Sequence, residues 1–103
     1  MKKKALLVGV NTSEDKKRFQ YLMEELGNLA AACHIETVGV VTQNLPRPHK
    51  AYYVGTGKLE ELKNFAEETD CDLVIFDDEL SGSQIKNLEE ALDRKVYDRT
   101  MLI

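Results

Sequence analysis

The sequence predicts an α/β domain in three layers, with a mostly parallel sheet of four to five strands and helices on both faces. Two largely apolar runs, residues 5–10 and 72–76, are typical of strands that are buried on both sides. The segments between and after them carry apolar residues at steps of three and four, which is the spacing of amphipathic helices. Strands and helices that alternate along a chain favour a parallel sheet.

Length and composition restrict the class of protein. With 103 residues, of which 43% are hydrophobic and 31% charged, the chain is expected to be one globular domain, 1–103, and not disordered. A net charge of −4 excludes a protein that coats nucleic acid with its whole surface, so any such contact is expected to be local. No apolar run approaches the roughly 18–20 residues of a membrane span, and the apolar stretch after the basic start is too short for a signal peptide. We therefore expect a cytoplasmic protein.

The first half of the chain is predicted to form a strand, a helix and a second strand. Strand 5–10 is followed by Thr12 and Ser13, residue types that cap helix N-termini. A helix is expected from 15 to 33, because apolar residues recur there along one face. Residues 35–43 are rich in β-branched side chains and should form the second strand.

The middle of the chain contains both prolines, so residues 46–50 are expected to form a loop. A short strand is predicted over 51–54. A Gly-Thr-Gly turn then leads into a helix from 58 to about 69, whose apolar residues share one face.

The last third of the chain begins with the apolar strand 72–76. Ser81 and Gln84 have the spacing of a capping box, which predicts the start of another helix, and 95–98 should form a last short strand. The two most apolar strands are expected in the centre of the sheet. The order of elements is that of a Rossmann-like or flavodoxin-like fold.

The loops at one edge of this sheet are candidates for ligand binding, because open α/β sheets bind ligands outside the carboxyl ends of their strands. Strand 72–76 is parallel to 5–10 only if the helix at 58–69 starts at this edge, so we expect 44–50 to carry the chain back across the sheet and 51–54 to run parallel again. An antiparallel strand 72–76 is the alternative. The side chains expected at the edge are Asn11, Thr12, Gly55, Thr56, Gly57, Lys58, Asp77, Asp78 and Glu79.

Two kinds of chemistry are candidates at this edge. The turn 55–58 could hold a phosphate through backbone N–H groups and its lysine, although Tyr52 and Leu59 stand where a P-loop needs Gly and Ser or Thr. The alternative is a tight turn that uses the conformational freedom of glycine. The acids at 77–79 could bind Mg²⁺ or transfer a proton; alternatively, they are solvated acids at a helix N-terminus that Ser81 caps. An acidic cluster beside an anion site would need a cation between them.

A basic and aromatic loop is the candidate for RNA contact, because RNA-binding surfaces combine cations with aromatic rings. The alternative is a solvated loop with half-buried tyrosines. The residues concerned are Arg47, His49, Lys50, Tyr52 and Tyr53.

Cysteine and histidine usage predicts no metal site. Cys33 and Cys71 are expected to be reduced and buried or half-buried, and neither they nor His34 and His49 have metal-ligand spacing. No nucleophilic triad or cofactor motif is present.

Several segments, taken in order, resemble a known family. They include the apolar strand 5–10, the motif Tyr-x-x-Gly-x-Gly-Lys at 52–58, the motif Phe-Asp-Asp-Glu-Leu-Ser at 76–81 and the end of the chain from 95 to 100. Together they are similar to the N-terminal domain of the HflX family of ribosome-associated GTPases, over nearly the whole chain. Gly82 and Met101 depart from the family pattern, in which proline and glycine are usual.

The resemblance implies a longer parent protein. The apolar run Met101, Leu102 and Ile103 is an unusual chain end, and the family continues there into paired helices and a GTPase domain that binds Mg²⁺ and GTP. That domain and its motifs are absent from this chain, which is expected to need no cofactor and to be catalytically inert. Its implied partners are its own GTPase domain and the large ribosomal subunit, for which it would be a regulatory and docking module. The alternatives are an independent nucleotide- or phosphate-binding domain that uses 55–58 and 77–79, and a scaffold without a ligand.

Overall fold

Four parallel strands form one sheet in the computed structural model, which describes residues 2–102. The predicted short strand at 51–54 is wrong, so the sheet has four strands within the described residues. The order β2-β1-β3-β4 places the two most apolar strands in the centre, as predicted, and every neighbouring pair is parallel. The bounds are Lys3–Asn11 for β1, Ile35–Asn44 for β2, Leu73–Phe76 for β3 and Lys95–Asp98 for β4.

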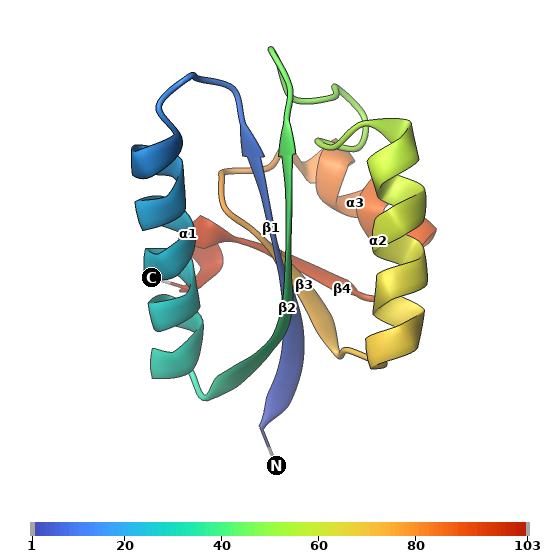
Figure 1. Cartoon of the computed structure of the whole chain (residues 1–103). Coiled ribbons are helices and arrows are strands. Elements are labelled where there is room, and N and C mark those ends of the chain that lie inside the picture. The colour runs from blue at the N-terminus through green and yellow to red at the C-terminus, as the bar shows by residue number, and fades with distance from the viewer. Residues whose placement is uncertain (1, 103) are drawn as a thin grey trace.

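Helices cover both faces of the sheet, which confirms the three-layer prediction (Figure 1). Successive side chains of β1 point to opposite faces: Leu6 and Val8 pack toward α2 and α3, and Ala5 and Leu7 pack toward α1. A short 3₁₀ helix, η1, follows β4 and packs beside α1 through Leu102. The bounds are Lys16–Ala32 for α1, Thr56–Thr69 for α2, Gly82–Leu92 for α3 and Arg99–Leu102 for η1.

The helix starts follow from local capping. The capping box of α3 is confirmed, because the Ser81 hydroxyl accepts from the Gln84 N–H at 3.1 Å and the Gln84 side chain accepts from the Ser81 N–H at 3.0 Å. Helix α1 is capped by Asp15, not by Thr12 or Ser13 as predicted. Ser13 instead closes a local turn onto the side chain of Asn11, which moves the helix start further along the chain.

The predicted return of the chain across the sheet is wrong. After β2 the chain stays at the carboxyl edge, where His49 and Tyr53 exchange both backbone hydrogen bonds in an isolated antiparallel bridge. Helix α2 then starts directly from this edge, because β2 already ends there. Strand β3 is therefore parallel to β1, as predicted, although the chain does not cross the sheet between β2 and α2.

Tyr53, and not a glycine, takes the left-handed conformation in this loop, with φ of 65°. No glycine among residues 2–102 has a positive φ, and Gly55 caps α2 with φ of −64°. The interpretation of 55–57 as a turn that uses glycine's conformational freedom is therefore wrong.

Gly39 allows helix α2 to approach the sheet. A Cβ at this position would lie 2.6 Å from the ring of Phe65 and 3.0 Å from Leu6. We expect Gly39→Val to destabilise the domain by about 1–3 kcal/mol, since a rigid ring on a packed helix must move. Urea unfolding measures this, with Gly57→Ala as the control because nothing lies within 4 Å of its added Cβ. Equal stability of the two variants would contradict the prediction.

The described residues include no helix that is long and apolar enough to cross a membrane.

Candidate functional site

The carboxyl edge of the sheet gathers the predicted loops, which lie together at the top of Figure 1. A cavity of about 320 Å³ brings Asn11 and Thr12 beside Asp77 and Asp78, with Arg18 of α1 on its wall. The turn 55–58 does not line this cavity. The structure thus brings residues of two of the three predicted segments together in one pocket, without Glu79 and without the turn 55–58.

Asp77 is held by an ion pair and is not a solvated acid. Its side chain is 4% exposed, and it accepts from the guanidinium of Arg99 at 2.6 Å. The same guanidinium reaches Glu25 at 3.0 Å and the backbone oxygen of Leu22 at 3.4 Å. Burial raises the pKa of Asp77, and Arg99 opposes that rise. Asp77 therefore ties β3 to α1 and η1.

Asp78 anchors the loop that follows β2. One oxygen accepts from the hydroxyl of Tyr53 at 3.0 Å, and the other accepts from the N–H of Glu79 at 2.8 Å. The Tyr53 ring stands edge-on to Phe76, with 5.7 Å between centroids. Burial and then the charge of Asp78 raise the pKa of Tyr53, so this tyrosine stays protonated and donates. Asp78 and Glu79 themselves are exposed.

The lysine of the turn 55–58 faces its own helix. The ammonium of Lys58 pairs with Glu61 at 2.8 Å, and the N–H of Gly55 donates to Gln43 at the end of β2 at 2.9 Å. Thr56 and Gly57 are exposed. A phosphate at this turn would have to compete with a carboxylate for the lysine.

The basic loop presents its two cations to solvent. Arg47 and Lys50 are exposed and make no ion pair with any residue in 2–102. His49 turns its Nδ1 inward, where it accepts from the N–H groups of Ala51 at 3.1 Å and Tyr52 at 3.2 Å. The rings of His49 and Tyr52 lie 5.7 Å apart, and both residues are half-buried.

The two tyrosines of this loop have different surroundings. Tyr53 is only 3% exposed, so the expectation that both are half-buried is correct for Tyr52 and wrong for Tyr53. A base cannot stack on a ring that is already packed in the core. Tyr53, one of the five residues predicted to contact RNA, is therefore not available to a base. It supports the loop from beneath.

Side chains of helix α3 hold the backbone of the basic loop in place. Gln84 donates to the backbone oxygen of His49 at 3.1 Å, and Asn87 donates to that of Ala51 at 3.2 Å. Together with the bond between Tyr53 and Asp78, these contacts attach the loop after β2 to the start of α3 and to the end of β3. The sequence interpretation missed these contacts, although the spacing of three residues between Gln84 and Asn87 places both on one helix face.

Asp98 is a buried carboxylate that the sequence interpretation missed. It accepts from the N–H groups of Leu80 at 3.1 Å and Met101 at 3.2 Å and from the Thr100 hydroxyl at 2.6 Å. Burial raises its pKa, but these hydrogen bonds outweigh burial and leave the pKa below its usual value. Asp98 thereby fixes the start of α3 to the end of β4.

The cysteines differ in exposure. Both are free, and Cys71 is buried as expected, but Cys33 is exposed, contrary to expectation, because it lies just beyond the last turn of α1. Residues 2–102 contain no cluster of three or more potential metal ligands.

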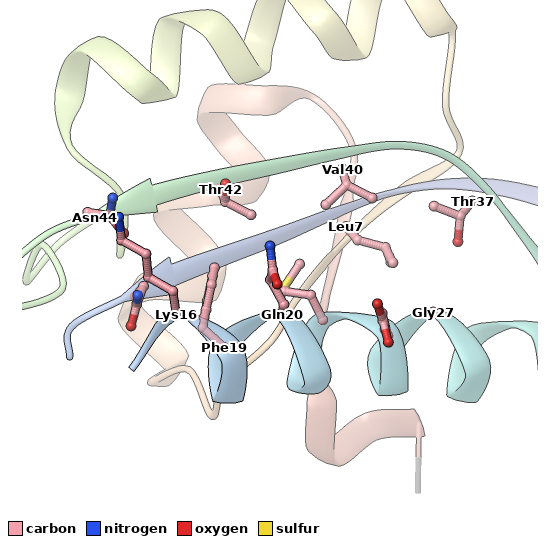
Figure 2. Close-up of a pocket in the computed structure, with 12 residues that line it drawn as sticks. Leu7, Lys16, Phe19, Gln20, Gly27, Thr37, Val40, Thr42 and Asn44 are labelled. Atoms are coloured by element: carbon pink, nitrogen blue, oxygen red, sulfur yellow. The ribbon is translucent and has the colours of Figure 1, made fainter. Parts of the chain in front are cut away.

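A second and larger cavity, of about 710 Å³, lies between α1 and β2 (Figure 2). Leu7 and Phe19 form part of its apolar wall, and Lys16, Gln20 and Thr42 line its rim. No pattern in the sequence pointed to it, because it depends on how far α1 extends across the sheet.

Comparisons with known proteins agree with the expected family. The family described as GTP-binding GTPase N-terminal matches residues 20–103. The GTPase HflX of Caldanaerobacter subterraneus subsp. tengcongensis is 47% identical over 99% of this chain and 23% of that protein. The GTPase HflX of Escherichia coli K12 is 34% identical over 96% of this chain and 23% of that protein.

The fold also occurs in a solved structure. The crystal structure of a complex of SsGBP and GDP aligns with a TM-score of 0.71 over 99% of this chain and 27% of that one, at 20% identity, which shows the shared fold alone. The chain thus spans about a quarter of the length of the relatives that it matches.

Proposed function

The chain belongs to the GTP-binding GTPase N-terminal family, and from that membership we propose that it is a regulatory and ribosome-docking domain of a cytoplasmic GTP-binding protein. In this proposal the domain catalyses no reaction. GTP and Mg²⁺ are held by a GTPase domain elsewhere in the longer protein, and the present domain couples the nucleotide state of that domain to binding of the large ribosomal subunit. The name GTPase HflX, which the relatives carry, supports a GTPase as the parent.

The single observation that carries the docking role is the clamped basic loop. Arg47 and Lys50 project from a loop whose backbone is fixed by Gln84 and Asn87. Because the loop is held before binding, little conformational entropy is lost when its cations meet a phosphate backbone. The acids of α2 and α3 and the net charge of −4 disfavour RNA contact over the rest of the surface.

The test reverses the charge of the loop in the longer protein that contains this domain. We expect Arg47→Glu with Lys50→Glu to weaken binding to large ribosomal subunits at least about tenfold, because two attractive interactions with phosphates become repulsive. Co-sedimentation with the GTP-bound protein at several salt concentrations measures the affinity. The dependence of binding on salt should also become less steep, by about one unit of slope for each phosphate that the loop no longer neutralises.

The matched control makes the same charge change elsewhere. Lys63 of α2 and Lys86 of α3 are exposed and make no ion pair in the described part of the chain, so Lys63→Glu with Lys86→Glu should leave docking within about twofold. Docking through this loop is refuted if the loop variant and the control bind equally at low and high salt.

An independent phosphate or nucleotide site at the carboxyl edge is the competing proposal. It draws support from the free first turn of α2, which has no side-chain cap. It is disfavoured because Lys58 pairs with Glu61, and because Asp77 and Asp78 face the neighbouring cavity. Saturable binding of GTP or ATP to the 103-residue chain, lost in Lys58→Ala, would favour this site over the docking role.

A further inference from the structure

Strand β2 is an unprotected edge of the sheet. It is the outermost strand on its side, and no strand among residues 2–102 pairs with its outer edge. It is 10 residues long, contains no proline, lysine or arginine, and carries Glu36 as its one charge. Edge strands of monomeric proteins are usually short or protected by charges, prolines or a covering segment. The outer edge of β2 has none of these features over most of its length.

The groove beside β2 leaves one face of the strand uncovered as well. Helix α1 packs on Ala5 and Leu7 of β1, and Gly27 lines the groove that lies between the helix and β2. Val40 is 53% exposed there, and Thr42 is also exposed (Figure 2). An apolar groove and a free backbone edge therefore lie side by side, which is the arrangement that accepts an added strand.

We propose that β2 pairs antiparallel with β2 of a second copy of this chain across a twofold axis. Two four-stranded sheets then become one continuous sheet, and the two grooves merge beneath the pair of α1 helices. The pairing uses the regular part of β2, residues 39–44, because the strand is irregular only further back, where the register with β1 shifts between Ala5 and Leu6. With the twofold axis at Val41, Val40 of each copy then lies opposite Thr42 of the other, on the face that lines the groove.

Charge complementarity favours a second copy as the occupant. The wall of the groove on α1 carries Lys16 near the carboxyl edge and Glu24 two helical turns further along. An antiparallel partner places the Lys16 end of one copy beside the Glu24 end of the other. No like charges meet in the middle of the strand, where Val40 and Thr42 are neutral.

The experiment measures the mass of the 103-residue chain in solution by analytical ultracentrifugation over a range of concentrations. We expect a reversible dimer. Val40→Lys with Thr42→Lys should dimerise at least about tenfold more weakly, because like charges then face each other across the axis. Val40→Asp with Thr42→Asp should weaken the dimer to the same degree for the same reason. A mixture of the lysine variant and the aspartate variant should form a heterodimer, since lysines of one copy then face aspartates of the other.

The control is Tyr21→Lys. Tyr21 is a 62% exposed side chain of α1 that does not line the groove, so its replacement adds a lysine away from the proposed interface. It should dimerise as the unmodified chain does. Circular dichroism shows that each variant is folded before its mass is compared. A chain that stays monomeric at every concentration overturns the proposal. The partner of the β2 edge would then be sought in another segment of the longer protein. A dimer that Val40 and Thr42 substitutions do not weaken also overturns it.

Discussion

Replacing Tyr53 by alanine is expected to destabilise the domain by about 3–5 kcal/mol, the usual cost of removing a buried aromatic ring. The ring is 3% exposed, stands edge-on to Phe76 and fills the space beneath the basic loop. Its hydroxyl is also lost as a donor to Asp78. Urea unfolding followed by circular dichroism measures the change in the free energy of unfolding.

Two controls separate the contributions of Tyr53. Tyr53→Phe keeps the ring and removes only the bond to Asp78, whose carboxylate is exposed and can turn to water, so we expect a loss of about 0.5–1.5 kcal/mol. Tyr52→Ala removes a neighbouring ring that is only half-buried and should cost less than Tyr53→Ala. A cost below about 1 kcal/mol for Tyr53→Ala would show that the ring does not support the loop.

Replacing Arg99 by methionine is expected to destabilise the domain by about 2–4 kcal/mol at neutral pH. The carboxylate of Asp77 is then buried without its cation, which costs more than an exposed ion pair is worth. Glu25 loses its partner too, but it is partly exposed and contributes little. The double variant with Asp77→Asn should be much less destabilised than the sum of the single changes. Additive effects would contradict a direct coupling of the two residues.

The effect of Arg99→Met should depend on pH. Burial already raises the pKa of Asp77, and loss of the opposing guanidinium raises it further. A group whose pKa is raised by folding contributes stability at low pH that is lost as the pH rises through that pKa. The gap in stability between the variant and the unmodified chain should therefore narrow as the pH falls toward 4, near the ordinary pKa of an aspartate. Unfolding curves at a series of pH values measure this gap.

The elements that the sequence predicted well are those encoded by local patterns. The apolar run of β1 predicted a central strand, and the spacing of Ser81 and Gln84 predicted the capped start of α3. The strand predicted over 51–54 is wrong because its β-forming residues suggested an extended segment, whereas Tyr53 adopts a left-handed conformation. Its backbone bridge to His49, its packing against Phe76 and its bond to Asp78 hold it there.

The candidate site was predicted in outline and not in its contacts. The sequence placed Asn11, the turn 55–58 and the acids 77–79 at one edge, and parallel strands bring the carboxyl ends of β1, β2 and β3 to that edge. It offered no sign that Asp77 is neutralised by Arg99, because 22 residues separate the two in the chain. The groove beside β2 was equally hidden, since its depth depends on where α1 lies over the sheet.

The sequence by itself determined the alternation of strands and helices, the parallel sheet and the family, because hydrophobic periodicity, capping and motif spacing are properties of neighbouring residues. Only the tertiary structure decided which polar side chains remain available. Packing paired Asp77 with Arg99 and Tyr53 with Asp78, and it left Arg47, Lys50 and the edge of β2 exposed. A charge or a backbone edge can bind a partner only if packing has not already supplied one, and packing is set by contacts between residues far apart in the chain.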